Sequence, residues 1–208
     1  MMSPPRELLT DLDLVDERLE LGPWELALLR PRQAEALLDE EAFEHEEFLP
    51  YWAELWTSGE TLAQEVARRD VASLSIVELG CGLALPSLAA ASGGAHVLAT
   101  DWSPEAIALA RENARRNGLE LETAVVRWSE PEALLERAPW DLVLAADVLY
   151  ERRNVDELLA LLAQLGGEIL LADPGRPHAK TFFERADEEW TIETHGSISS
   201  LRLKRSVV

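Results

Sequence analysis

The sequence predicts an α/β protein built on a doubly wound, mostly parallel sheet. Short apolar segments typical of buried strands alternate with segments of helical pattern along residues 75–172, and this alternation is typical of parallel sheets covered by helices. Two further strand-like segments, residues 190–194 and 200–204, can pair as a hairpin and add one antiparallel strand. We therefore expect a Rossmann-like, seven-stranded sheet that is mostly parallel with one antiparallel strand.

Ahead of this pattern the chain predicts a short N-terminal extension. Two alternating segments, residues 14–21 and 24–30, flank a Gly-Pro pair and favour a β-hairpin, although their Leu, Glu and Ala content also permits a helix. Residues 33–38 have the pattern of a helical turn or two. We expect residues 1–48 to form this extension and residues 49–208 to form the main domain, with no linker between them.

The central segment of the chain has the layout of a nucleotide-binding βαβ unit. A strand at residues 75–79 runs into a Gly-Cys-Gly turn, a helix at residues 86–92 follows, and a second strand at residues 96–100 ends at Asp101. Glycines let the backbone approach a ligand closely, and the start of the helix offers N–H groups to an anion. Asp101 lies about 20 residues further on, where a carboxylate can accept hydrogen bonds from ribose hydroxyls.

The spacing of this turn indicates which nucleotide it would bind. A dinucleotide fingerprint requires a small residue at the position of Leu85. The chain instead has Glu78, Gly80, Gly82 and Ala84 at alternate positions, which resembles the E/D-x-G-x-G-x-G signature of class I S-adenosylmethionine methyltransferases. We expect the alanine in place of the third glycine only to tighten the turn. A strand–turn–helix of some other α/β protein is the alternative.

The other elements of the main domain follow from helix caps and apolar runs. We expect helices at residues 60–69, 104–117, 131–137, 155–165 and 179–188, and strands at residues 121–126, 141–146 and 168–172. Ser103 and Pro104 are typical of a helix start, and Gly118 is typical of a helix end. Residues 141–146 are apolar enough for the buried centre of a parallel sheet.

An aromatic segment precedes the first helix of the domain. Tyr51, Trp52 and Trp56 surround Glu54, which is unusual for a connecting segment. Either these rings pack the N-terminal extension against the core, or they form one wall of a ligand pocket, because large rigid rings line such pockets well.

Polar residues gather where the strands end. Ligands of doubly wound sheets bind beyond the carboxyl ends of the strands. The residues expected there are Glu78, Gly80, Asp101, Trp128, Asp147, Tyr150 and Asp173. Any one of these acids could cap a helix, but acids at so many strand ends favour a binding site for a cation.

Several motifs together resemble one family. The segments at residues 51–56 (YWAELW), 78–82 (ELGCG) and 146–150 (ADVLY) are similar to those of the seven-β-strand protein lysine methyltransferases, class I enzymes that modify non-histone proteins. The segment at residues 173–176 (DPGR) is similar to the branch that methylates the electron-transfer-flavoprotein β-subunit. The resemblance covers about residues 45–176.

The resemblance, taken with the turn, implies a set of site residues. The cofactor would be S-adenosylmethionine, with S-adenosylhomocysteine as the product. The residues expected to bind it are Trp56, Glu78, Gly80, Gly82, Asp101, Trp102, Trp128 and Ala146. The D-x-x-Y/F motif of the family corresponds to Asp147 and Tyr150, the expected catalytic residues. Arg127 differs from the family pattern, in which an acid often precedes this tryptophan.

The expected function is methyl transfer to an amine, most naturally a protein lysine side chain. We expect Asp147 to orient the amine and Tyr150 to pack over it. A small-molecule N- or O-methyltransferase and a non-catalytic S-adenosylmethionine-binding module are the alternatives. A nucleophilic role for Cys81 is disfavoured because the sequence shows no histidine paired with it, and the G-x-S-x-G motif of hydrolases is absent.

Composition limits the partners. The net charge of −20 would repel phosphate backbones, so we expect no nucleic acid and a protein substrate with a basic surface, although an acidic surface also serves solubility. No apolar run approaches the roughly 20 residues that span a bilayer, so we expect no membrane partner.

Cys81 is the single cysteine, which excludes an internal disulfide and a cysteine-based zinc site. We expect no metal, a cytoplasmic location and a monomer.

Overall fold

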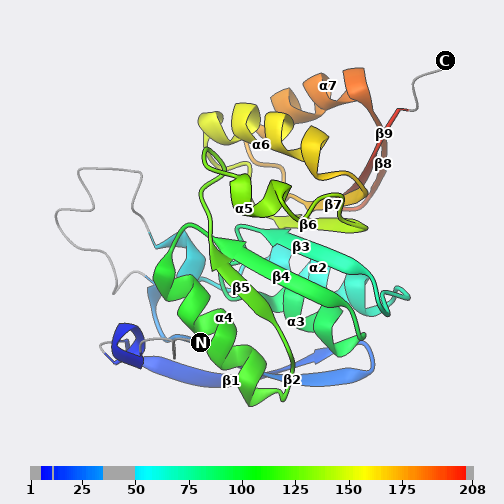
Figure 1. The fold of residues 1–208 in the computed structure, drawn as a ribbon. Coiled ribbons are helices and arrows are strands. Elements are labelled where there is room, and N and C mark those ends of the chain that lie inside the picture. The colour runs from blue at the N-terminus through cyan, green and yellow to red at the C-terminus, as the bar shows by residue number, and fades with distance from the viewer. Residues whose placement is uncertain (1–5, 11, 35–49, 205–208) are drawn as a thin grey trace, which may run out of the picture.

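The computed structural model describes residues 6–10, 12–34 and 50–204, and a seven-stranded sheet forms its centre (Figure 1). The strands are β3 (Ser75–Leu79), β4 (His96–Asp101), β5 (Glu122–Val125), β6 (Leu142–Ala146), β7 (Glu168–Ala172), β8 (Trp190–His195) and β9 (Ile198–Leu203). Their order across the sheet is β5-β4-β3-β6-β7-β9-β8. β9 is antiparallel to both of its neighbours, and the remaining pairs are parallel. The expected fold class is confirmed.

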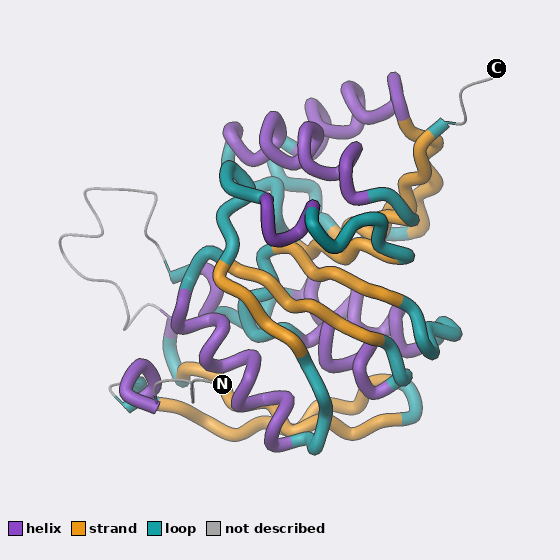
Figure 2. The backbone as a smooth tube through the Cα atoms, in the orientation of Figure 1, coloured by secondary structure: helices purple, strands orange, loops and turns teal. Residues whose placement is uncertain are grey.

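Helices cover both faces of this sheet, as Figure 2 shows. They are α2 (Thr57–Ala67), α3 (Leu85–Ser92), α4 (Pro104–Arg116), α5 (Glu132–Leu135), α6 (Arg152–Leu165) and α7 (Ala179–Glu189). Alternate strand residues point to opposite faces. Ile76 packs with α2 and α3 in one apolar cluster, whereas Val77 packs with α6 and α7 in another. The sheet is therefore buried on both sides, which explains its nearly continuous apolar strands.

The N-terminal hairpin is present and packs on the helix layer. β1 (Leu14–Leu21) pairs antiparallel with β2 (Trp24–Pro31), which confirms the expected hairpin, and the buried leucines of β2 join the cluster of α2 and α3. The side-chain amide of Asn113 in α4 accepts a hydrogen bond from the Leu29 N–H at 2.7 Å and donates one to the Leu29 carbonyl at 3.1 Å. The Asn117 amide bonds both backbone groups of Ala27 in the same way.

Some expected boundaries are wrong by a few residues. α2 begins at Thr57 instead of residue 60, because Trp56 is still extended and its carbonyl accepts the N–H of Gly59 at 2.9 Å. Gly59 therefore lies inside the first turn, where we expected it to precede the helix. α6 begins at Arg152 instead of residue 155. Residues 35–38 of the helix expected at residues 33–38 lie outside the described residues.

None of the helices in the described segments combines the length and the continuous apolar character that crossing a bilayer requires.

Candidate functional site

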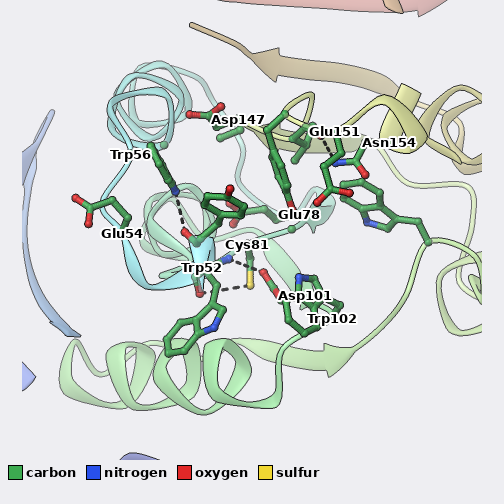
Figure 3. A pocket seen from close by; sticks show the side chains of 18 of the residues that line it. Trp52, Glu54, Trp56, Glu78, Cys81, Asp101, Trp102, Asp147, Glu151 and Asn154 are labelled. Carbon is green, nitrogen blue, oxygen red and sulfur yellow. Dashed lines mark hydrogen bonds between the residues drawn. The ribbon is translucent and has the colours of Figure 1, made fainter. Parts of the chain in front are cut away.

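A cavity of about 870 Å³ opens beyond the carboxyl ends of β3, β4 and β6. Figure 3 shows its lining, which comes from the turn after β3, the ends of β4 and β6, and the aromatic segment before α2. The ten residues expected to bind the cofactor or to act in catalysis all line it: Trp56, Glu78, Gly80, Gly82, Asp101, Trp102, Trp128, Ala146, Asp147 and Tyr150. Asp173, which we also expected at this edge, does not line the cavity. The structure thus brings together residues that lie up to 94 positions apart in the chain (150 − 56).

The glycine turn after β3 requires its glycines. Gly80 and Gly82 have φ values of 64° and 50°, which residues other than glycine rarely adopt. A Cβ atom at Gly82 would lie 3.0 Å from the carbonyl oxygen of Trp52, and one at Gly80 would lie 3.4 Å from the Trp128 ring. The turn is therefore packed between the aromatic segment and the loop after β5.

Ala84, which we expected to tighten the turn, occupies a position where the backbone conformation favours glycine. It adopts φ 61° and ψ 29° as the residue before α3, the left-handed conformation that glycine takes without steric cost. The family glycine at this position is thus explained by backbone conformation, and Ala84 keeps that conformation with its methyl group fully buried.

Glu78 is buried beneath the turn, with only 1% of its surface exposed. Its Oε2 accepts hydrogen bonds from the Ser87 N–H at 2.9 Å and from the Ser87 hydroxyl. Burial raises its pKa to about 8 despite these bonds. The expectation of free N–H groups at the start of α3 is therefore wrong in part, because the Ser87 N–H is already bonded to Glu78 and Pro86 has none.

Asp101 connects the end of β4 to the glycine turn. Its Oδ2 accepts the Gly82 N–H and its Oδ1 accepts the Ser103 N–H, both at 2.9 Å. Burial raises the pKa of Asp101 to about 6. The backbone N–H of Trp102 also bonds this carboxylate, and because a carboxylate has about four acceptor positions, Asp101 retains capacity for a hydroxyl donor.

The opposite wall carries a bidentate ion pair. Arg176 donates from Nε to Asp147 Oδ1 at 2.6 Å and from Nη2 to Oδ2 at 3.0 Å. Its guanidinium carbon also lies 5.2 Å from the centroid of the Trp56 ring. The Asp147 side chain is only 6% exposed, and that of Arg176 is 31% exposed. Sequence analysis placed Asp147 here but assigned no site role to Arg176, although the DPGR segment at the end of β7 was the available signal.

The loop that carries Arg176 is fixed at its base by Asp173. One carboxylate oxygen of Asp173 accepts the backbone N–H groups of Gly175 and Arg176 at 2.7 and 2.8 Å. The other oxygen is buried and has no partner among the described residues. The hydrogen bonds to Asp147, and then the charges of Asp147 and Asp173, raise the pKa of Arg176.

Aromatic rings complete this wall. The Tyr51 and Tyr150 ring centroids lie 5.0 Å apart, and those of Tyr51 and Trp56 lie 6.4 Å apart. The Trp56 indole N–H donates to the Tyr51 carbonyl at 2.8 Å. Burial, followed by the charge of Glu151, raises the pKa of Tyr150 to about 12, so its phenol stays protonated. The aromatic segment is thus a pocket wall, one of the two roles we considered.

Neither metal chemistry nor a reactive thiol is supported by this part of the chain. The described residues contain no group of three or more His, Cys, Asp or Glu side chains that could hold a metal ion. Burial raises the pKa of the Cys81 thiol well above its usual range, which keeps it in the unreactive protonated form.

The match to a family model decides the family. A model described as lysine methyltransferase matches residues 51–189, which spans the aromatic segment, the glycine turn, the D-x-x-Y motif and the end of α7. The chain belongs to the lysine methyltransferase family. The resemblance inferred from the motifs is confirmed.

Curated relatives agree with this lysine methyltransferase assignment. The chain is 31% identical over 139 residues to the electron transfer flavoprotein beta subunit lysine methyltransferase of Xenopus laevis, covering 61% of this chain and 53% of that protein. It is 32% identical over 114 residues to the histone-arginine methyltransferase METTL23 of Homo sapiens, covering 52% of this chain and 60% of that protein. The chain thus aligns with little more than half the length of these relatives.

Solved structures show that this lysine methyltransferase family member has a class I methyltransferase fold. The T. thermophilus 16S rRNA N2 G1207 methyltransferase, in complex with AdoMet and guanosine, matches with a TM-score of 0.67 at 14% identity and covers 92% of this chain and 51% of its own. The Synechocystis magnesium protoporphyrin IX methyltransferase with bound SAM matches with a TM-score of 0.52 at 17% identity, covering 80% and 99%. At such identities the likeness concerns the fold.

Proposed function

We propose that this chain transfers a methyl group from S-adenosylmethionine to a protein lysine side chain. The observation that carries this proposal is a single cavity with two different walls. One wall is a glycine turn held by a buried acid, and the other combines a carboxylate with aromatic rings. The first suits a nucleoside with a cationic tail, and the second suits an alkylammonium acceptor.

The residues present fit S-adenosylmethionine. The cavity volume lies within the range of about 300–1,000 Å³ typical of small-ligand pockets. Gly80 and Gly82 line the cavity with backbone in a conformation that glycine adopts without strain, and Asp101 retains acceptor capacity for a ribose hydroxyl. We assign the cofactor to these residues together with Trp56, Glu78, Trp102, Trp128 and Ala146. When bound, the cofactor supplies a methyl group on a sulfonium and leaves as S-adenosylhomocysteine.

We call the wall formed by Asp147, Tyr150, Tyr51 and Trp56 the acceptor wall. For methyl transfer, the lysine amine bound there must be neutral. A lysine with a pKa near 10.4 needs roughly 4–5 kcal/mol to lose its proton at pH 7. The loss of water around the amine as it enters the cavity disfavours its charged form. Asp147 orients the nitrogen, and the proton released by the ammonium passes to solvent. The new N–CH₃ bond forms as the S–CH₃ bond breaks, so the methylated nitrogen carries the positive charge.

The finer expectations about partners and organisation remain part of the proposal. An acidic chain with a net charge of −20 suits a protein substrate with a basic surface and disfavours nucleic acid. One buried thiol and no second cysteine suit a monomer in the reducing cytoplasm. We also propose that residues 1–48 are an extension that supports the methyltransferase domain of residues 49–208, since its hairpin is bonded to α4.

A protein arginine acceptor is the second candidate. The Arg176 guanidinium shows that an arginine head group fits between Asp147 and Trp56, and one of the relatives is named as a histone-arginine methyltransferase. A small-molecule acceptor and a non-catalytic binding module have no specific observation in their favour.

Incubation of the full chain with methyl-labelled S-adenosylmethionine and a cell lysate tests the proposal. We expect a discrete labelled protein band, and methyl-lysine after acid hydrolysis of that band. Methyl-arginine would support the second candidate instead. Label confined to the small-molecule fraction, or no transfer at all, would contradict both.

A further inference from the structure

The acceptor wall already contains a cation. The Arg176 guanidinium bonds both oxygens of Asp147, at 2.6 and 3.0 Å, and lies 5.2 Å from the Trp56 ring centroid. A carboxylate beside an indole face is the chemistry that recognises an alkylammonium or a guanidinium. We call the space between Asp147 and Trp56 the cation site.

We propose that Arg176 determines acceptor specificity by filling the cation site until a cationic acceptor side chain replaces it. This inference rests on the proposed function, since it concerns the acceptor side of the same cavity. It adds a selection step: an acceptor must supply a positive charge in order to displace the arginine.

The position of Arg176 suits such an exchange. Its side chain is 31% exposed, and it lies in the loop between β7 and α7. It follows Gly175, where an added Cβ atom would meet none of the described residues within 4 Å. The backbone of the loop is held separately, because Asp173 accepts the N–H groups of Gly175 and Arg176. The side chain can therefore leave while the base of the loop stays in place.

The energetics of the exchange favour cations over neutral groups. The Asp147 side chain is 6% exposed, and a buried carboxylate that loses its partner is strongly destabilised. An incoming ammonium restores the ion pair and the contact with the Trp56 ring, while the freed guanidinium gains water. A hydroxyl acceptor restores neither the charge nor the cation–π contact, so it does not displace Arg176.

Titration of the full chain with n-butylammonium chloride tests this inference, because this probe has the head group and stem of lysine. The readout is the indole Nε1–H resonance of Trp56, identified from a Trp56→Phe spectrum, at constant ionic strength and without cofactor. We expect Arg176→Met to bind n-butylammonium at least tenfold more tightly than the wild type, with no comparable gain for the neutral isostere n-butanol.

Arg185→Met is the matched control, because Arg185 also pairs with an aspartate 29 residues away, Asp156, but on the exposed surface of α6 and α7. It should bind both probes like the wild type. Unchanged n-butylammonium binding in Arg176→Met, or an equal gain for n-butanol, would overturn the inference. If Arg176→Met does not fold, Arg176→Lys carries the test, since lysine cannot form two parallel bonds, and it should bind n-butylammonium about threefold more tightly. Unchanged binding in a folded Arg176→Lys variant would then overturn the inference.

The proposed function is checked separately on the same proteins. Calorimetry with S-adenosylmethionine reports on the glycine turn and Asp101, whereas the n-butylammonium titration reports on the cation site. Failure of S-adenosylmethionine to bind the wild type would contradict the proposed function, and the n-butylammonium result would still decide whether Arg176 occupies a cation site.

Discussion

Glu78 and Asp101 are buried acids that keep their protons to a higher pH than exposed carboxyl groups do. The pKa of Glu78 is raised to about 8 and that of Asp101 to about 6, in both cases chiefly by desolvation. A raised carboxyl pKa means that the folded chain binds a proton that the unfolded chain has already lost. Stability therefore falls as the pH rises from the ordinary pKa to the raised one.

The Glu78→Gln variant tests this burial. Between pH 6.5 and 8, Asp101 is largely ionised in both states, so Glu78 dominates the change. The free energy of unfolding of the wild type should fall by about 1.6 kcal/mol over this interval, because the slope is about 1.4 kcal/mol per pH unit at first and half of that at pH 8. Urea denaturation at the two pH values should show a much flatter dependence for Glu78→Gln. Equal pH slopes for the two proteins would contradict the assignment.

Asp147 has two proposed functions in the acceptor wall: it orients the acceptor nitrogen, and it pairs with Arg176 when no acceptor is bound. Its backbone has φ 57°, which asparagine also tolerates, so Asp147→Asn should fold. The variant loses the charge that orients the acceptor cation. We expect the initial rate of label transfer to lysate protein to fall at least tenfold, while the calorimetric affinity for S-adenosylmethionine changes less than threefold.

The control for this prediction is Asp156→Asn, whose carboxylate pairs with Arg185 at the exposed surface. It should leave both quantities unchanged. Equal losses of transfer rate and cofactor affinity in Asp147→Asn would assign Asp147 to cofactor binding instead.

At the scale of elements, two asparagines attach the hairpin to α4. Asn113 is fully buried and bonds both backbone groups of Leu29. Asn113→Ala leaves a buried N–H and a buried carbonyl without partners, so it should lower the free energy of unfolding by about 2–4 kcal/mol. Urea denaturation measures this loss.

Asn117→Ala is the comparison for the hairpin prediction. Asn117 bonds Ala27 in the same way, but these bonds are only partly buried. Its loss should cost about 1 kcal/mol, because water can replace the amide. A smaller loss for Asn113→Ala than for Asn117→Ala would show that the hairpin is not held as described.

The elements themselves could largely be predicted from local sequence patterns. Period-two alternation predicts the hairpin, and the Ser103 and Pro104 pair predicts the start of α4, where the Ser103 hydroxyl accepts the Ala106 N–H at 3.1 Å. The start of α2 could not be predicted, because glycine usually disfavours a helix. Gly59 lies in the first turn only because Trp56 before it is extended. The asparagine contacts join segments 84 and 90 residues apart, which no local pattern reveals.

At the scale of the whole molecule, the parallel sheet assembles the site. Because the strands end at one edge, most residues chosen for their place after a strand line one cavity, and Asp173 alone of that set lies behind the lining, at the base of the Arg176 loop. That part of the site could be predicted from the sequence. The partners within the cavity could not: Glu78 bonds Ser87, and Asp147 bonds Arg176 through loops of two different strands. Those contacts depend on side-chain directions that spacing along the chain does not define.

The central claim is that the glycine turn and Asp101 bind S-adenosylmethionine, and calorimetric titration of the full chain tests it most directly. We predict one S-adenosylmethionine per chain for the wild type, at least tenfold weaker binding for Asp101→Ala, and no detectable heat with NAD⁺. Tight binding of NAD⁺, or no heat from S-adenosylmethionine with the folded wild-type chain, would contradict the account.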